Sequence, residues 1–189
     1  MEARIADCLR PPLRIHSGKR DHHARLPVIL VIGLVGFGSL LGLPGIVLSE
    51  LSFFVAAPWL SAPVIEEIMK PFGVYLLVMN WPGNVRRQLS IALLSGMAGL
   101  VFGLLESVLY VFSYSQNQLS ADYVLFRFTV PVLLHVVAST MFGFSINAHN
   151  LRSVMRGDVK RKSLWMFPAI AIAIHAIYNI TVTVWNPDF

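Results

Sequence analysis

The chain has 189 residues, of which 56% are hydrophobic and only 13% charged, and its mean hydropathy is +0.66. The hydrophobic share and the mean hydropathy are higher than in soluble domains and the charged share is lower, so we expect an integral membrane protein without a separate soluble domain. The net charge of +5 does not indicate nucleic-acid binding, because thirteen of the fifteen Lys and Arg residues fall in three segments, 1–26, 86–87 and 152–162. We therefore expect no nucleic-acid partner.

The first apolar run, 26–43, ends at a Pro-Gly pair typical of a turn. We expect the basic segment 1–26 to be a cytoplasmic tail and residues 27–186 to form a single transmembrane helical bundle. Residues 46–60 are apolar but contain a glutamate and a proline. They are expected to be an interfacial segment or part of the next span.

Four further spans follow, expected at residues 63–80, 90–112, 123–149 and 164–185. Short loops rich in Lys and Arg mark the cytoplasmic side of a membrane. With five crossings, all three basic segments lie on that side, and the polar segment 113–122 lies on the other. The sequence thus predicts an all-α, polytopic bundle of about five transmembrane helices with a cytoplasmic N-terminus. We expect it in the prokaryotic plasma membrane.

The second span carries Glu66, Glu67 and Lys70 inside an apolar run. Each charge at the centre of a span costs about 2.5–3.5 kcal/mol on insertion scales, so these residues need a reason to be there. Helical spacings of three and four residues bring the Lys70 ammonium to both carboxylates. Pro63 is expected to open this helix in its first turn, and Pro71 to kink it and free the carbonyl of Glu67. We interpret these charges as the centre of a buried polar site.

Each later span also carries polar groups at membrane depth. Phe102 and Glu106 are four residues apart, as are His175 and Asn179, so each pair shares a helix face. His135 lies in the span between them. Each residue alone could make a structural ion pair or an interhelical hydrogen bond. Four helices that carry acids and imidazoles at similar depth favour one shared site instead.

Arg127 stands near the outer end of the fourth span. Pro131 lacks the amide that would bond the Arg127 carbonyl, so we expect this carbonyl to be free for another donor. Irregular backbone at membrane depth is tolerated where it faces protein or a wet cavity.

Four short motifs lie in order along the spans: Glu66-Glu67-x-x-Lys70, Phe102-x-x-x-Glu106, Arg127 with His135 and Thr140-x-x-Gly143, and His175-x-x-x-Asn179. Together they resemble the PrsW-type intramembrane proteases, in the superfamily with type II CAAX prenyl endopeptidases and Abi bacteriocin-immunity proteins. Asn179 stands where PrsW sequences often have Asp, and Glu106 where CAAX enzymes have His. The resemblance implies that the chain cleaves a peptide bond of a membrane-associated protein at the lipid bilayer.

The resemblance implies catalytic roles for Glu66, Glu67, Glu106, His135, His175 and Asn179, with Lys70, Phe102, Arg127 and Thr140 in support. Amide hydrolysis needs an activated water, donors for the oxyanion and a proton for the leaving amine. We expect Glu66 to activate the water, Glu67 to be an orienting acid held by Lys70, and Glu106 to share the water. His175 and Asn179 are expected to stabilise the oxyanion, and His135 to donate or relay the proton. Residue spacing alone does not decide which of Glu66 and Glu67 activates the water.

Two alternatives use the same residues. Zinc held by Glu66, Glu106, His135 and His175 would make the chain a zinc-dependent protease. We expect a metal-free glutamic site without a cofactor, because the chain has no His-Glu-x-x-His motif and its carboxylates outnumber its imidazoles. The other alternative is a non-catalytic membrane scaffold or immunity protein, or an ion carrier that uses Glu and His as relays.

Overall fold

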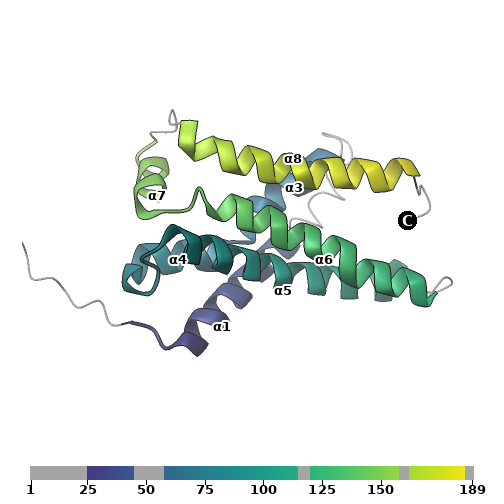
Figure 1. The fold of residues 1–189 in the computed structure, drawn as a ribbon, viewed down its shortest axis with the longest axis horizontal. Coiled ribbons are helices and arrows are strands. Elements are labelled where there is room, and N and C mark those ends of the chain that lie inside the picture. The colour runs from purple at the N-terminus through teal and green to yellow at the C-terminus, as the bar shows by residue number, and fades with distance from the viewer. Residues whose placement is uncertain (1–24, 45–57, 115–119, 158–161, 186–189) are drawn as a thin grey trace, which may run out of the picture.

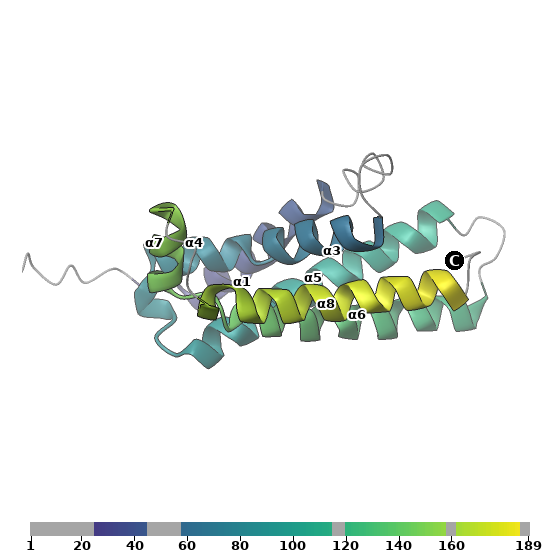
Figure 2. The same ribbon diagram turned by 90° about the horizontal axis from the view of Figure 1, so that it is seen from above.

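The computed structural model describes residues 25–44, 58–114, 120–157 and 162–185. Within these ranges the chain is helical and has no strand, which confirms the predicted all-α class. The long helices α5 (Gln88–Tyr114), α6 (Ala121–Gly143) and α8 (Lys162–Trp185) run lengthwise along the bundle, as Figures 1 and 2 show. The other elements are α1 (Val28–Ser39) with the 3₁₀ turn η3 (Leu40–Gly42), α3 (Pro58–Met69), α4 (Phe72–Asn80), the 3₁₀ turn η5 (Pro82–Asn84) and α7 (Ala148–Met155).

Three described helices are long and apolar enough to cross a membrane: Gln88–Phe112, Ala121–Gly143 and Leu164–Val184. Large apolar side chains on these helices are exposed, as expected of a surface in contact with lipid. The first expected span is a shorter apolar helix, Val28–Gly42. The second is the broken pair α3 and α4. An integral membrane bundle is therefore confirmed, with three helices of full spanning length in the described residues rather than five.

The second expected span breaks where the sequence predicts. Helix α3 ends at Met69 and α4 begins at Phe72, so the break falls at Pro71, which has no amide to continue the helical ladder. The prediction for Pro63 was wrong, because α3 already begins at Pro58 and Pro63 lies inside it. Most of segment 46–60 lies outside the described residues.

The fourth expected span ends earlier than residue 149. Helix α6 stops at Gly143, and the separate helix α7 follows in the expected basic loop. The side-chain amide of Gln88 donates to the carbonyls of residues 143, 144 and 146, and the side chain of Asn147 caps α7 by accepting from the amide of Asn150. These side chains satisfy the backbone groups that the helix ends leave open.

Described residues at or next to the three basic segments lie at the same end of the bundle. Just before α1, the backbone of Leu26 exchanges two hydrogen bonds with the Asn84 side chain, at 3.1 and 2.9 Å. Gln88, next to Arg86 and Arg87, bonds the α6–α7 connection. Figure 1 shows α7 and the end of α4 together at this end. The arrangement agrees with the expectation that the basic segments lie on one side of the membrane. That this side is cytoplasmic stays a prediction.

Helices α5 and α6 form the most extensively packed pair in the described bundle. Their contact, which we call the glycine seam, consists of Gly96, Gly99 and Gly103 of α5 against α6. A Cβ atom on Gly99 would overlap the backbone carbonyl of His135, and one on Gly103 would lie 2.9 Å from the His135 ring. Small residues allow helix backbones to approach this closely in a membrane. The seam therefore sets the position of His135 relative to α5.

Candidate active site

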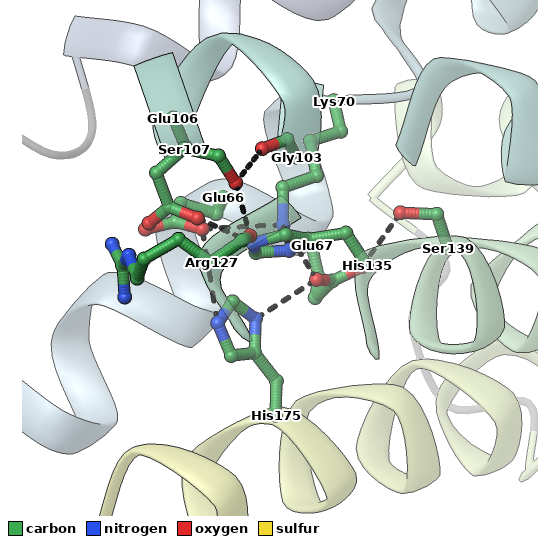
Figure 3. Close-up of polar contacts among 10 residues, drawn as sticks. All are labelled: Glu66, Glu67, Lys70, Gly103, Glu106, Ser107, Arg127, His135, Ser139 and His175. Atoms are coloured by element: carbon green, nitrogen blue, oxygen red, sulfur yellow. Dashed lines mark hydrogen bonds and ion pairs between the residues drawn. The ribbon is translucent and has the colours of Figure 1, made fainter. Parts of the chain in front are cut away.

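Six side chains from four helices meet inside the bundle, and we call them the carboxylate–imidazole cluster: Glu66, Glu67, Lys70, Glu106, His135 and His175. Figure 3 shows them converging from α3, from its break with α4, and from α5, α6 and α8. All are buried except Glu106, whose side chain is 13% exposed. Sequence spacing predicted only the contacts within the Glu66–Lys70 segment. The contacts between helices come from tertiary packing.

Lys70 lies at the break between α3 and α4, and its ammonium is the centre of the cluster. The Nζ atom lies 2.8 Å from Glu67 Oε1, 3.1 Å from Glu66 Oε2 and 2.7 Å from His135 Nδ1. It also lies 4.2 Å from the centroid of the buried Phe102 ring. Because an ammonium only donates, His135 accepts through Nδ1 and carries its proton on Nε2.

The two histidines pair with different carboxylates. His135 Nε2 lies 2.6 Å from Glu106 Oε2, to which it donates in the tautomer set by Lys70. His175 Nδ1 lies 2.9 Å from Glu67 Oε1. The two rings meet edge to face, with centroids 4.9 Å apart. His175 Nε2, the ring nitrogen not bonded to Glu67, faces Glu66 Oε2 at 3.9 Å.

Glu67 is held from three sides. Its Oε1 atom receives Lys70 and His175, and its Oε2 atom accepts from the Ser139 hydroxyl at 3.1 Å. Sequence reasoning missed Ser139. The one available signal was its spacing of four residues from His135, which places both on one face of α6. Serine is common at helix contacts in membranes, so this signal did not indicate chemistry.

Two residues that the sequence analysis included lie apart from these contacts. The Thr140 hydroxyl donates to the Val136 carbonyl at 2.7 Å and lies against Gly96 in the glycine seam. Asn179 is half-buried one turn after His175, and its side chain makes no hydrogen bond to another described residue. Thr140 therefore belongs to the helix packing, whereas Asn179 has an amide available to a ligand.

Arg127 is 8% exposed, and its guanidinium stacks on the Tyr110 ring at 3.8 Å. Its carbonyl accepts from the Ser107 hydroxyl at 2.6 Å, a hydroxyl that also reaches the Gly103 carbonyl at 2.7 Å. The expectation that Pro131 frees the Arg127 carbonyl for another donor is thereby confirmed. Ser107, next to Glu106 in the chain, was not among the residues singled out from the sequence.

The cluster has a donor set for a metal ion. One ligand atom each from Glu66, His135 and His175 lies within 4.8 Å of the others. Glu66 Oε2 is buried, has Lys70 Nζ as an ion-pair partner at 3.1 Å, and faces the unbonded nitrogen of His175 at 3.9 Å. Both ring nitrogens of His135 are hydrogen-bonded, to Lys70 and to Glu106, so one of these bonds would have to be given up for His135 to hold a metal ion. Support of a metal-binding histidine by a carboxylate, as Glu67 supports His175, is usual in such sites.

The charge of the cluster also fits a divalent cation. With the three carboxylates ionised and both imidazoles neutral, three negative charges face one ammonium, which leaves a net charge of −2 among the six buried or nearly buried side chains. Buried charge is costly unless it is balanced. The residues present therefore fit zinc, whose usual ligands are imidazole nitrogen and carboxylate oxygen.

Comparison with known protein families gives a match to the PrsW family intramembrane metalloproteases over residues 26–189. No curated protein and no solved structure matches the chain. The matched range contains the whole described bundle apart from its first residue, and all six cluster residues. The resemblance to PrsW-type proteases is confirmed, and the wider relation to CAAX endopeptidases and Abi proteins stays an expectation. The chain belongs to the PrsW family of intramembrane metalloproteases.

Proposed function

We propose that this chain cleaves a peptide bond of a membrane-associated protein with a water molecule activated at the carboxylate–imidazole cluster, and that the cluster holds a zinc ion. The observation that carries the proposal is the buried donor set of Glu66, His135 and His175 in a chain of a metalloprotease family. The net charge of −2 that the cluster carries when its three carboxylates are ionised supports a divalent cation. The metal alternative from the sequence is therefore preferred to the metal-free site expected first.

Glu66, His135 and His175 would hold the ion. Bound zinc makes a water ligand acidic enough to act as a nucleophile near neutral pH and polarises the carbonyl that is attacked. Glu67 orients His175 through Nδ1, and Lys70 and Ser139 hold Glu67 in turn. This arrangement keeps the second nitrogen of His175 directed toward Glu66.

Glu106 is the carboxylate best placed to move protons. It is the one member of the cluster with appreciable exposure, at 13% of its side chain, so a substrate and a water can reach it. In this proposal Glu106 accepts a proton from the attacking water and returns it to the leaving amine, while the Asn179 amide donates to the oxyanion. The half-buried Asn179 side chain, with no hydrogen bond to another described residue, supports that role.

A metal-free glutamic mechanism is the second candidate, and a specific observation favours it. Lys70 and Glu106 together bond both ring nitrogens of His135, so the hydrogen bonding of this residue is complete without a metal ion. In that mechanism Glu66 is the base, because its carboxylate, unlike that of Glu67, is not held by a serine or histidine hydrogen bond and can accept a proton from water. The metal content of the active protein distinguishes the two candidates.

The proteolytic function is tested by comparing membrane-protein fragments across the proteome between cells with the wild-type chain and cells with the Glu66→Gln/Glu67→Gln double variant. The proposal predicts fragments that are present with wild type and absent with the double variant. Asp122→Asn, at an exposed position in the first turn of α6, is the matched control and retains the wild-type fragments. An identical fragment set in wild type and double variant would contradict proteolysis and favour a scaffold. Proton or ion flux in liposomes would favour a carrier.

The metal is tested on purified, active protein by elemental analysis. The proposal predicts one zinc per chain, loss of cleavage on chelation and recovery on addition of zinc. Full cleavage by protein that contains less than a tenth of an equivalent of any divalent metal would reject zinc and leave the glutamic mechanism.

A further inference from the structure

Three helices of the cluster carry a second set of polar side chains toward the end of the bundle opposite the basic segments, and we call these residues the outer layer: Tyr110, Arg127 and Tyr178. Tyr110 lies four residues after Glu106 on α5, and Tyr178 lies three after His175 on α8. Arg127 lies eight residues before His135 on α6. At a rise of ~1.5 Å per residue, the outer layer is about 5 to 12 Å beyond the cluster.

The guanidinium of Arg127 is buried without an anionic partner in the part of the chain that the structure describes. Its residue is 8% exposed, its Nε atom has no hydrogen bond, and no carboxylate of the described residues lies within ion-pair distance of it. In Figure 3 the Arg127 side chain points to the same side as the Glu106 carboxylate, yet the two groups make no ion pair. A buried charge without a partner is costly, so this position calls for an anion from elsewhere.

A second unmet donor lies in the same layer. The Tyr178 hydroxyl is buried and has no hydrogen bond among the described residues. The Arg127 side chain is held in place by its stack on Tyr110, and its backbone is held by Ser107. A fixed guanidinium is a typical binding group for a carboxylate, and a hydroxyl in the same layer of the bundle can add a further donor.

We propose that Arg127 and Tyr178 bind a carboxylate of the protein substrate, on the outer side of the bond that is cleaved. This inference rests on the proposed proteolytic function. The carboxylate comes either from an Asp or Glu side chain or from the C-terminus of the substrate. Because Arg127 is enclosed between helices next to the cluster instead of facing lipid, a substrate group fits this position better than a lipid phosphate.

The test uses the full chain in liposomes and a peptide that spans a cleavage site found in the fragment comparison. Each carboxylate on the outer side of that site is replaced by the matching amide, and the C-terminal carboxylate by a carboxamide. We expect one replacement to lower kcat/KM of the wild type by about tenfold or more, which identifies the source of the carboxylate. In Arg127→Gln the same replacement changes kcat/KM less than twofold, and Arg127→Lys shows an intermediate response.

The control and a second variant guard against misfolding. Arg87→Gln makes the same chemical change at an exposed arginine and should retain the full preference for the carboxylate. If Arg127→Gln does not fold, Tyr178→Phe is measured in its place and should reduce the preference about threefold. The inference is overturned if no amide replacement lowers the wild-type kcat/KM more than twofold, or if the variants keep the wild-type preference.

A binding measurement separates this inference from the proposed function. The probe is a labelled Leu/Ala transmembrane peptide with a single Asp or a single Asn, and energy transfer to an acceptor on Cys8, the one cysteine of the chain, reports binding. Wild type should bind the Asp peptide about tenfold more tightly, and Arg127→Gln should bind both peptides equally, even if neither peptide is cleaved. Equal binding of both peptides to wild type overturns the inference. A preference seen in phospholipid-free maltoside micelles but lost in liposomes would assign Arg127 to a lipid phosphate and reject the substrate carboxylate.

Discussion

The carboxylate–imidazole cluster and the glycine seam use the same helix, α6, in opposite ways. The cluster depends on the side chains that α6 presents, whereas the seam depends on side chains that α5 lacks. His135 takes part in both, because its carbonyl lies against Gly99 while its imidazole lies between Lys70 and Glu106. Removing a group from the cluster should therefore remove chemistry and leave the fold intact. Adding an atom to the seam should keep every reacting group and displace it.

The largest expected effect is in the cluster. His175→Gln removes a ring nitrogen of the metal donor set and breaks the bond to Glu67, so cleavage should fall at least a thousandfold, equivalent to about 4 kcal/mol in the barrier. Zinc content should fall with it, while the helix content of the purified variant should stay at the wild-type level by circular dichroism. Retention of a tenth of the wild-type cleavage rate would contradict the role proposed for His175.

The next effect is in the seam. Gly99→Ala places a Cβ atom against the His135 carbonyl and 2.8 Å from the Ser139 hydroxyl, so α5 and α6 must separate. Overpacking of this kind costs about 1–3 kcal/mol, which a denaturant titration in detergent measures, and cleavage should fall about tenfold. Gly33→Ala is the matched control, because a Cβ atom there meets nothing within 4 Å. Equal stability of the two variants would show that the seam does not determine the site.

Ser139 joins the two regions, since its hydroxyl bonds Glu67 and also faces Gly99. Ser139→Ala removes a hydrogen bond to a charged group, worth about 1.5–3 kcal/mol, and should lower kcat about tenfold with less effect on KM. In the double variant with Gly99→Ala the two effects should be less than additive, because the missing hydroxyl makes room for the new Cβ. Thr129→Ala, at an exposed threonine whose hydroxyl bonds its own helix, is the control. Strictly additive effects of the two substitutions would show that the cluster and the seam act independently.

The smallest expected effect lies beside the cluster, at the proline of α6. Ser107→Ala leaves the Arg127 carbonyl without its donor at a cost of about 1 kcal/mol in the free energy of unfolding, and cleavage should change only two- to threefold. In a Pro131→Ala background the amide of residue 131 can bond that carbonyl instead, so Ser107→Ala should then cost less. An equal cost in both backgrounds would reject this account of the Ser107 hydroxyl.

The two interior prolines, Pro71 and Pro131, show which structural features can be predicted from the sequence. Chemistry alone indicated that Pro71 and Pro131 each free a carbonyl, and both predictions concern the missing amide of proline. The chain breaks into two helices at Pro71 but continues through Pro131. At Pro131 the donor is Ser107 of another helix. Which helix supplies such a donor does not follow from local spacing.

The outcomes at Pro63 and Gly143 have the same cause. Pro63 was expected in a first turn, but the helix extends back to Pro58. The fourth span was expected to reach residue 149, but Gln88 of the preceding helix bonds the carbonyls where α6 ends. Apolar runs predict that a helix exists in a membrane, because its backbone must bond internally there. They do not predict its ends, which depend on partners distant in the sequence.

By itself the sequence determined the membrane class, the helical phase of each polar group and the contacts of Lys70 with Glu66 and Glu67, because these follow from hydropathy and from spacings within one helix. Tertiary structure alone decided that Lys70 also bonds His135, that Ser139 holds Glu67, and that Arg127 is enclosed without an anion from the described residues. Those contacts depend on the relative height of neighbouring helices. That height is set by how closely backbones approach at residues such as Gly99. The hydropathy of the sequence does not indicate which glycines have this packing role.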